Sequence, residues 1–206
     1  MKPLRIVIMA KAPVAGLAKT RLIPLLGNEG AALLARRMLI HTINTAIAAD
    51  IATVECCVTP DHSDPVWSVF KRDYLLQWSS QSEGQLGQRM SDVAERVIAH
   101  GEKIILIGSD CPMLNSNHLR LAAEWLQFGE AAMIPVSDGG YCLLALDQFH
   151  PSLFQNINWS TSTVADESRA RFASLGWRLA EFDELHDIDH EEDISFVPLE
   201  MLEKII

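Results

Sequence analysis

Short apolar runs that alternate with helical stretches constrain this fold more than any other feature of the chain. Residues 4–8 and Lys103–Ile107 are rich in β-branched residues and have the composition of buried strands. Each run leads into a polar loop and then into a stretch with helical spacing, and the alternation continues along the sequence. The pattern predicts an α/β domain in which a mostly parallel sheet is covered by helices on both faces.

The expected elements follow from the spacing of apolar residues and from turn signals. Asn28 can cap a long first helix, and Asp189 with Glu192 resembles a capping box that would begin a last helix near residue 190. We expect strands at 4–8, 52–58, 75–78, 103–107, 131–136, 141–146 and 177–182, and helices at 28–48, 64–72, 85–99, 117–128, 165–174 and from about 190.

Composition sets the broad class. The 206 residues are enough for one well-buried domain, and no linker-like segment divides them, so we expect a single domain over residues 1–206. A net charge of −10 argues against binding to nucleic acid or to membrane surfaces and favours small-molecule partners. No signal peptide or spanning segment is recognisable, so a cytoplasmic location is expected. The sequence does not predict an oligomeric state.

The four cysteines lack the spacing of a zinc site or of a redox Cys-x-x-Cys motif. We expect Cys56, Cys57, Cys111 and Cys142 to be free thiols, packed as small apolar side chains.

The loop after the first strand concentrates positive charge in an acidic chain. Lys11, Lys19 and Arg21 lie close together in sequence, around Gly16. Cations this close repel one another unless an anion is present, and a polyphosphate is a common small anion that demands several donors. The loop is therefore a candidate phosphate-binding loop, although a solvated basic turn has the same spacing. It fits neither a P-loop nor a Rossmann glycine pattern, so any phosphate would be held largely by side chains.

Two acidic segments are candidates for a metal site. Asp110 directly follows the apolar run Lys103–Ile107, where it could bind a hard cation such as Mg²⁺ or Mn²⁺, or simply cap a turn. Asp187 and Asp189 alternate, so in an extended segment both would face one way and could complete that site. A helix cap and a solvated acidic face explain the same residues.

Three further segments are candidates for lining a ligand pocket. Asp138, Gly139, Gly140 and Tyr141 would suit a sugar or acceptor pocket, or a tight hairpin turn. Arg89 near the start of a helix could meet another anion. Trp159, Ser160 and Thr161 combine an aromatic ring with hydroxyl groups, as a buried Trp beside a helix cap also would.

Six segments together resemble one family of nucleotide-diphospho-sugar transferases, the radical-SAM/selenodomain-associated transferases, also described as glycosyltransferases associated with arsenosugar biosynthesis. The segments span nearly the whole chain and read AKAPVAGLAKTRL, GQLGQRM, IGSDCPML, PVSDGGYCLLAL, INWST and HDIDHEEDI. The resemblance implies a GT-A-type fold, which is a Rossmann-like three-layer sandwich with a mostly parallel mixed sheet. It also implies a sugar-nucleotide donor and a divalent cation.

The resemblance carries roles to particular positions. Lys11, Gly16, Lys19 and Arg21 would belong to the nucleotide-diphosphate loop, and Asp110 would take the place of the metal-binding aspartate. Residues 138–141 would border the sugar or the acceptor. Many metal-dependent GT-A enzymes carry Asp-x-Asp, but position 112 here is Pro, so a second metal ligand must come from elsewhere, with Asp187 or Asp189 as candidates.

Three functions are compatible with these features. In a glycosyltransferase, Lys19, Arg21 and a metal on Asp110 would neutralise the leaving diphosphate, while Asp138 takes the proton of a small-molecule acceptor. The sequence KTRL leading into AALLARRML also resembles 2-phospholactate guanylyltransferase, whose reaction on a nucleoside triphosphate would release pyrophosphate. A nucleotide-binding module without catalysis is the third.

Overall fold

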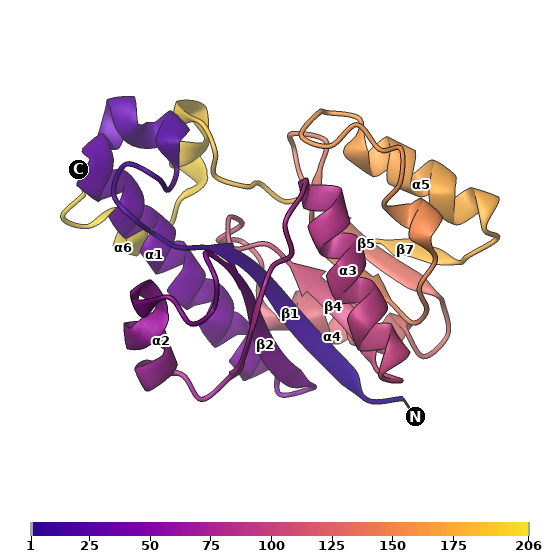
Figure 1. Cartoon of the computed structure of the whole chain (residues 1–206). Coiled ribbons are helices and arrows are strands. Elements are labelled where there is room, and N and C mark those ends of the chain that lie inside the picture. The colour runs from indigo at the N-terminus through magenta and orange to yellow at the C-terminus, as the bar shows by residue number, and fades with distance from the viewer. Residues whose placement is uncertain (1, 206) are drawn as a thin grey trace.

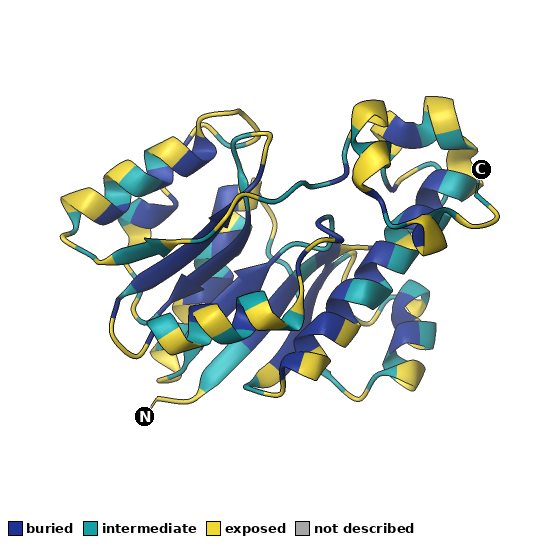
Figure 2. Ribbon diagram, turned by 180° about the vertical axis from the view of Figure 1, so that it is seen from behind, coloured by how far each residue is buried: buried dark blue, intermediate teal, exposed yellow. Residues whose placement is uncertain are grey.

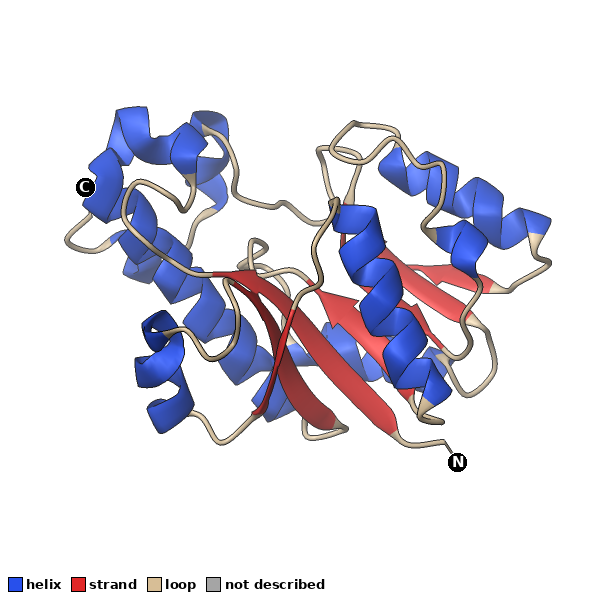
Figure 3. Cartoon of the chain, viewed as in Figure 1, coloured by secondary structure: helices blue, strands red, loops and turns tan. Residues whose placement is uncertain are grey.

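The computed structural model describes residues 2–205 and shows seven strands in one sheet (Figure 3). The strands are β1 (Leu4–Lys11), β2 (Thr53–Thr59), β3 (Gln77–Ser80), β4 (Lys103–Ile107), β5 (Ala131–Pro135), β6 (Tyr141–Leu146) and β7 (Leu179–Glu181). The helices are α1 (Ile23–Ala49), α2 (Ser68–Asp73), α3 (Leu86–Ala99), α4 (Ser116–Trp125), α5 (Val164–Ser174) and α6 (Leu199–Leu202). Short 3-10 turns occupy Thr20–Leu22, Pro65–Trp67, Pro151–Leu153 and Glu191–Phe196.

The strand order is β3-β2-β1-β4-β6-β5-β7, and only β6 runs antiparallel to its neighbours. The central strands are buried on both faces, as their continuous apolar runs predict (Figure 2). The carboxyl ends of the parallel strands and the amino end of β6 share one edge of the sheet. That edge is where an open α/β sheet binds its ligands.

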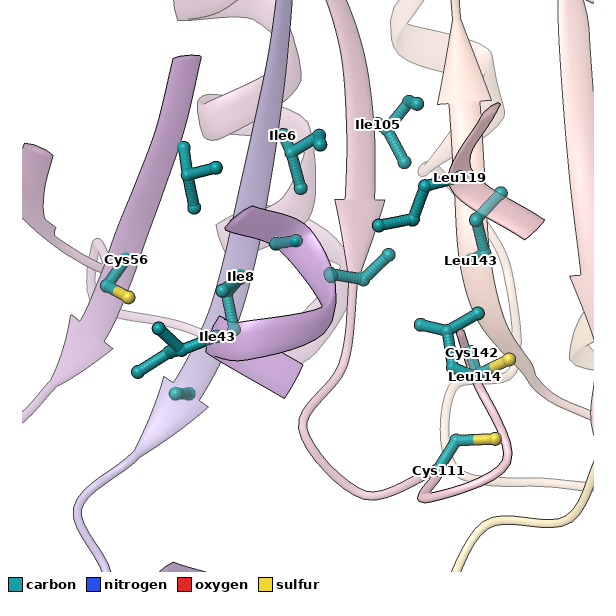
Figure 4. Close-up of a cluster of buried hydrophobic side chains, with 14 of the residues drawn as sticks. Ile6, Ile8, Ile43, Cys56, Ile105, Cys111, Leu114, Leu119, Cys142 and Leu143 are labelled. Atoms are coloured by element: carbon teal, nitrogen blue, oxygen red, sulfur yellow. The ribbon is translucent and has the colours of Figure 1, made fainter. Parts of the chain in front are cut away.

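Helices cover both faces of the sheet (Figure 1). On one face, Ile6, Ile8 and Ile105 pack with Leu39 and Ile43 of α1 and with residues of α2 and α4, in a cluster drawn in part in Figure 4. On the other face, Val7, Ile104 and Leu106 pack against α3 and α5. The expected three-layer α/β fold with a mostly parallel mixed sheet is confirmed. Cys56, Cys57, Cys111 and Cys142 are free and buried, as expected.

The C-terminal segment passes from β7 back to α6, which contacts α1 at the other side of the molecule (Figure 1). Within it, the N–H of Leu185 donates to the carbonyl of Pro135, and the N–H of Ile188 donates to the carbonyl of Asp110. Ile188 is fully buried beside Leu22 and Leu34. We call residues 185–190 the strap. Its extended conformation places Asp187 and Asp189 on the face opposite Ile188, as their alternation predicts.

Several expected boundaries were wrong, for local reasons. The first helix begins at Ile23, and Asn28 instead follows a break at Gly27, whose φ is +69°. The third strand lies at Gln77–Ser80, later than expected, and the preceding Leu75 is fully exposed. The remaining elements differ from expectation by a few residues at their ends.

The last expected helix is split in two. Pro198 keeps the preceding Val197 extended, so a 3-10 turn over Glu191–Phe196 is followed by the short α6. The expected cap with Glu192 was also wrong. Asp193 accepts hydrogen bonds from the backbone N–H groups of Asp189 and His190, at 2.9 and 2.7 Å.

Among residues 2–205, no helix combines the length and the apolar character that a membrane span requires.

Candidate active site

A cavity of about 500 Å³ opens at the ligand-binding edge of the sheet. Its walls come from the ends of β1 and β4, the loop after β5, the first turns of α3, residues 159–162 and the strap. The expected site residues that line it are Arg21, Asp110, Asp138, Gly140, Tyr141, Trp159, Ser160, Thr161, Asp187 and Asp189. One crevice thus contains candidates that lie far apart in the sequence.

Lys19 lies at the charged centre of this site without lining the cavity. Its side chain is 6% exposed, and its Nζ lies 2.9 Å from Asp110 Oδ1 and 2.8 Å from Asp189 Oδ1. Burial would lower the pKa of Lys19, but the two carboxylates outweigh burial and raise it. Lys19 therefore remains charged and ties the strap to the loop after β4. The backbone of Lys19 is left-handed, with φ +47°, which is uncommon outside glycine.

Arg21 is the arginine that faces the cavity. It is 60% exposed, and one guanidinium nitrogen lies 3.4 Å from Asp189 Oδ2. Burial raises the pKa of Asp189, but Lys19 and Arg21 outweigh burial and lower it below its usual range. The exposed guanidinium can therefore meet an anionic ligand while it contacts the strap.

Three other expected anion-binding residues do not line the cavity. Lys11 donates through Nζ to the carbonyl of Leu17 at 2.8 Å. Arg89 donates through Nε to the carbonyl of Gly84 and through a terminal nitrogen to Gln81. Gly16 adopts a positive φ of +78° and shapes the loop. The structure thus brings Arg21 to the cavity and uses Lys11 and Arg89 to brace neighbouring loops.

Asp110 is not a helix cap. The cap of α4 is Asn115, whose side chain accepts from the N–H groups of Asn117 and His118. The carboxylate of Asp110 is 49% exposed, contacts Lys19 and lines the cavity. Asp110 is therefore accessible from the cavity, and its role as a metal ligand stays a prediction.

Asp187 is a carboxylate in an unfavourable electrostatic environment. Burial and the nearby charges of Asp138 and Asp189 raise its pKa to about 6, and Lys19 offsets this only in part. Four carboxylates, from Asp110, Asp138, Asp187 and Asp189, therefore face two cations, Lys19 and Arg21. The excess of negative charge is what a divalent cation would neutralise.

The donor set suits a hard cation held partly by its substrate. Within residues 2–205, no three His, Cys, Asp or Glu side chains are close enough to hold one ion. Magnesium commonly binds through one or two carboxylates together with water and substrate phosphates, and Asp110 and Asp187, which line the same cavity, have the ligand chemistry of such a site. Asp189 is less suited to be a metal ligand, because its carboxylate is already paired with both Lys19 and Arg21.

Replacing Asp187 with Asn should stabilise the protein in a pH-dependent way. A raised pKa means that the folded state holds the proton more tightly, so stability falls as the pH rises from about 4 through 6. Asn removes that loss and should gain about 1–3 kcal/mol at pH 8 and almost nothing at pH 4. Thermal melting at both pH values checks this. Asp183→Asn, an exposed change near the strap, is the control, and an equal gain at both pH values would contradict the explanation.

An aromatic wall closes the other side of the cavity. The rings of Tyr141 and Trp159 meet edge to face, with centroids 6.5 Å apart. Trp159 packs over Gly87, where an added Cβ would lie 2.0 Å from the indole nitrogen. Trp159 Nε1 donates to the carbonyl of Phe154 at 3.4 Å. The sequence places Gly87 at the start of the helix that carries Arg89, but the space that it leaves for Trp159 depends on a contact with a distant loop, which the sequence does not reveal.

The turn after β5 is a tight hairpin and also a cavity wall. Asp138 Oδ1 accepts from the N–H of Gly140 at 2.7 Å, and Gly139 has a φ of +87°. Gly139 lies behind the wall, against residues 162–165, and its carbonyl accepts from the N–H of Ala165. The hairpin-turn interpretation is confirmed, and Asp138, Gly140 and Tyr141 also line the cavity, whereas Gly139 does not.

Replacing Gly139 with Ala should distort this wall. The new Cβ would lie 2.1 Å from the carbonyl oxygen of Ser162. The matched control is Gly176→Ala, whose φ of +68° imposes similar strain and whose Cβ meets nothing within 4 Å. Overpacking typically costs about 1–3 kcal/mol, so Gly139→Ala should lower Tm by roughly 2–12 °C more than the control does. Equal melting temperatures of the two variants would show that the loop around Ser162 moves aside without loss of stability.

Comparison with known proteins places this chain in a family. Residues 42–161 match the model of a family described as an uncharacterized protein conserved in bacteria (DUF2064). The chain belongs to this family. No curated protein matches the chain in sequence.

Solved structures share the fold of this DUF2064 protein. A protein from Desulfovibrio desulfuricans G20, provisionally named a nucleotide-diphospho-sugar transferase, is 27% identical with a TM-score of 0.84, over 92% of this chain and 84% of that one. The 4-diphosphocytidyl-2C-methyl-D-erythritol synthase of Anaerococcus prevotii DSM 20548 is 13% identical with a TM-score of 0.63, over 95% and 94%. CMP:2-keto-3-deoxy-manno-octonic acid synthetase complexed with CTP is also 13% identical, with a TM-score of 0.59, over 98% and 99%.

The expected nucleotide-diphospho-sugar transferase fold is thereby confirmed. The likeness to the 27% identical protein named as a nucleotide-diphospho-sugar transferase supports a transferase class. The cavity residues that the sequence analysis did not single out include His190, Ser162, Met9 and Met90. His190 could have been found, because it directly follows Asp189 at the end of the strap.

Proposed function

We propose that this protein is a glycosyltransferase that takes the sugar from a nucleotide-diphospho-sugar donor and transfers it to a small-molecule acceptor. The observation that carries the proposal is the single crevice in which Arg21 and the Lys19–Asp110 pair face Asp138 and the aromatic wall. One part of this cavity suits a diphosphate, and the other suits the group that receives the sugar. The six-segment resemblance supports assigning the chain to the radical-SAM/selenodomain-associated transferases.

The proposed chemistry assigns a separate task to each group. The exposed guanidinium of Arg21 holds the diphosphate, whose negative charge grows as it leaves. Lys19 keeps Asp110 and Asp189 in place and adds a buried positive charge beside the cavity. A divalent cation, Mg²⁺ or Mn²⁺, held by Asp110 and Asp187 would supply Lewis-acid stabilisation of the diphosphate oxygens.

Asp138 is the proposed proton acceptor. One of its oxygens is held by the N–H of Gly140, which fixes the carboxylate at the cavity wall. As the acceptor oxygen forms its bond to the anomeric carbon, the bond between that carbon and the diphosphate breaks, and the hydroxyl proton passes to Asp138.

Nucleotidyl transfer is the second candidate. The basic loop and the following helix resemble 2-phospholactate guanylyltransferase, and Arg21 of that segment lines the cavity. In this reaction an acceptor oxygen would attack the α-phosphorus of a nucleoside triphosphate and release pyrophosphate.

The product distinguishes the two reactions. We expect the purified protein to release a nucleoside diphosphate from at least one of a panel of sugar nucleotides in the presence of Mn²⁺. Separate incubations contain nucleoside triphosphates, with pyrophosphate as the measured product. Pyrophosphate release without nucleoside diphosphate release would favour the second candidate. Nucleotide binding without either product would favour a non-catalytic module.

A further inference from the structure

The charges of the cavity are unevenly distributed. Among the described residues that line it, Arg21 is the lone lysine or arginine, and it lies beside Asp189 of the strap. Lys19 is buried and already shared by two carboxylates. The cavity therefore offers one exposed guanidinium, enough for a single anionic group.

The half of the cavity around the aromatic wall has a different character. Its apolar surface comes from Tyr141 and Trp159, with Met90, Val136 and Val164 nearby in the lining. Residues 160–162 contribute three hydroxyl-bearing side chains, and Asp138 contributes a carboxylate. Asp187 also lines the cavity, where the proposed function assigns it to the cation.

We propose that the acceptor, in the sugar transfer proposed above, is an uncharged molecule that carries hydroxyl groups and an apolar face. The apolar face packs on the aromatic wall, and hydroxyl groups bond to residues 160–162 and to Asp138. Binding of acceptors that carry a phosphate or a carboxylate is disfavoured, because they would lie beside Asp138, and Arg21, the lone lysine or arginine among the described lining residues, is taken up by the diphosphate.

The exclusion has a simple electrostatic origin. The diphosphate already uses Arg21, and the cation uses Asp110 and Asp187, so a second anion meets the carboxylate of Asp138 in a partly buried cavity. Like charges several ångströms apart at an effective dielectric near 20–40 repel enough to weaken binding by about tenfold or more. A neutral polyol suffers no such repulsion.

The test compares two probes that share an aromatic ring and differ in charge. Phenyl β-D-glucoside and phenyl phosphate are titrated calorimetrically into the full chain. The part of the cavity around Arg21 is first saturated with inorganic pyrophosphate and Mn²⁺. We expect the glucoside to bind at least tenfold more tightly than phenyl phosphate. Trp159→Ala should weaken binding of the glucoside and leave binding of pyrophosphate intact. This result would show that the glucoside binds at the aromatic wall.

A second variant adds the missing charge. Ser160 lines the cavity and has a left-handed backbone, a conformation that Lys19 shows a lysine can adopt. Ser160→Lys should improve binding of phenyl phosphate several-fold and so lower the ratio of glucoside affinity to phenyl phosphate affinity. Ser160→Gln, which adds similar length without charge, should leave this affinity ratio unchanged.

The proposal is overturned if phenyl phosphate binds the loaded protein as tightly as the glucoside does, if neither probe binds, or if Ser160→Lys leaves the ratio unchanged. The binding ratio is measured without a sugar donor. Absence of sugar transfer with the expected ratio would therefore refute the proposed function alone. Sugar transfer together with a preference for phenyl phosphate would refute the acceptor class alone.

Discussion

Asp110→Asn is expected to lower metal-dependent turnover by roughly 10²–10³-fold, the loss typical when one group that stabilises a developing negative charge is removed. Asp110 lines the cavity and contacts Lys19 at 2.9 Å. The change to Asn keeps the shape of the side chain but removes the charge that would hold a cation. Release of nucleoside diphosphate from a sugar nucleotide, measured over a Mn²⁺ titration, gives the size of the loss.

The control for this change is Asp73→Asn, on the surface of α2, where the carboxylate pairs only with the exposed Arg72. It should retain wild-type turnover and wild-type metal dependence. If Asp110→Asn behaved in the same way, Asp110 would have no part in binding the cation or the diphosphate.

Lys19→Met is expected to destabilise the fold and weaken pyrophosphate binding together. The change leaves Asp110 and Asp189 facing each other without the ammonium that joins them. Losing a hydrogen bond to a charged group typically costs about 1.5–3 kcal/mol, which corresponds to a Tm lower by roughly 3–12 °C. Thermal melting and calorimetric titration with pyrophosphate measure the two effects.

The pH dependence of this loss has a defined sign. The pKa of Asp189 is lowered in the folded protein, so the stability that it gains is present above its ordinary value near 3.8 and is lost as the pH falls through the folded pKa. The stability difference between wild type and Lys19→Met should therefore shrink in acid.

Lys11→Met tests whether the location of Lys19 matters, since it removes a nearby lysine at the end of β1, just before the loop that holds Lys19. Lys11 is exposed and donates to one backbone carbonyl. We expect a change within about 0.5 kcal/mol, typical of surface substitutions. An equal effect of the two variants would mean that general positive charge, and not the contact with Asp110 and Asp189, is what the loop supplies.

Sequence reasoning predicted that the candidate site residues would lie near one another, because strand ends in a parallel sheet meet at one edge, and many of them line one cavity. Asp110 directly follows a strand, and Lys19 lies in the loop after another, so topology alone brings them near each other. The alternation of Asp187 and Asp189 predicted that both carboxylates would face one way in an extended segment, and both line the cavity while Ile188 between them is buried. These inferences needed only local pattern and the rule for open α/β sheets.

Pairing between distant side chains was beyond local pattern. Lys19 bonds to Asp189, 170 residues later, and this contact depends on the path of the strap. Trp159 reaches its position because Gly87 leaves space for the indole, which no sequence periodicity encodes. The buried Glu55 is a third example. It lies inside a strand and is satisfied by Arg5, Arg96 and Ser79, each from a separate element.

The path of the strap also bears on how the protein matures during synthesis. A ribosome that has released the first 180 residues has produced nearly all of the sheet, but neither Asp187 nor Asp189. Lys19 then has only Asp110 as a partner, and the crevice lacks one wall. Nascent chains should therefore form most of the sheet before the strap completes the wall of the cavity.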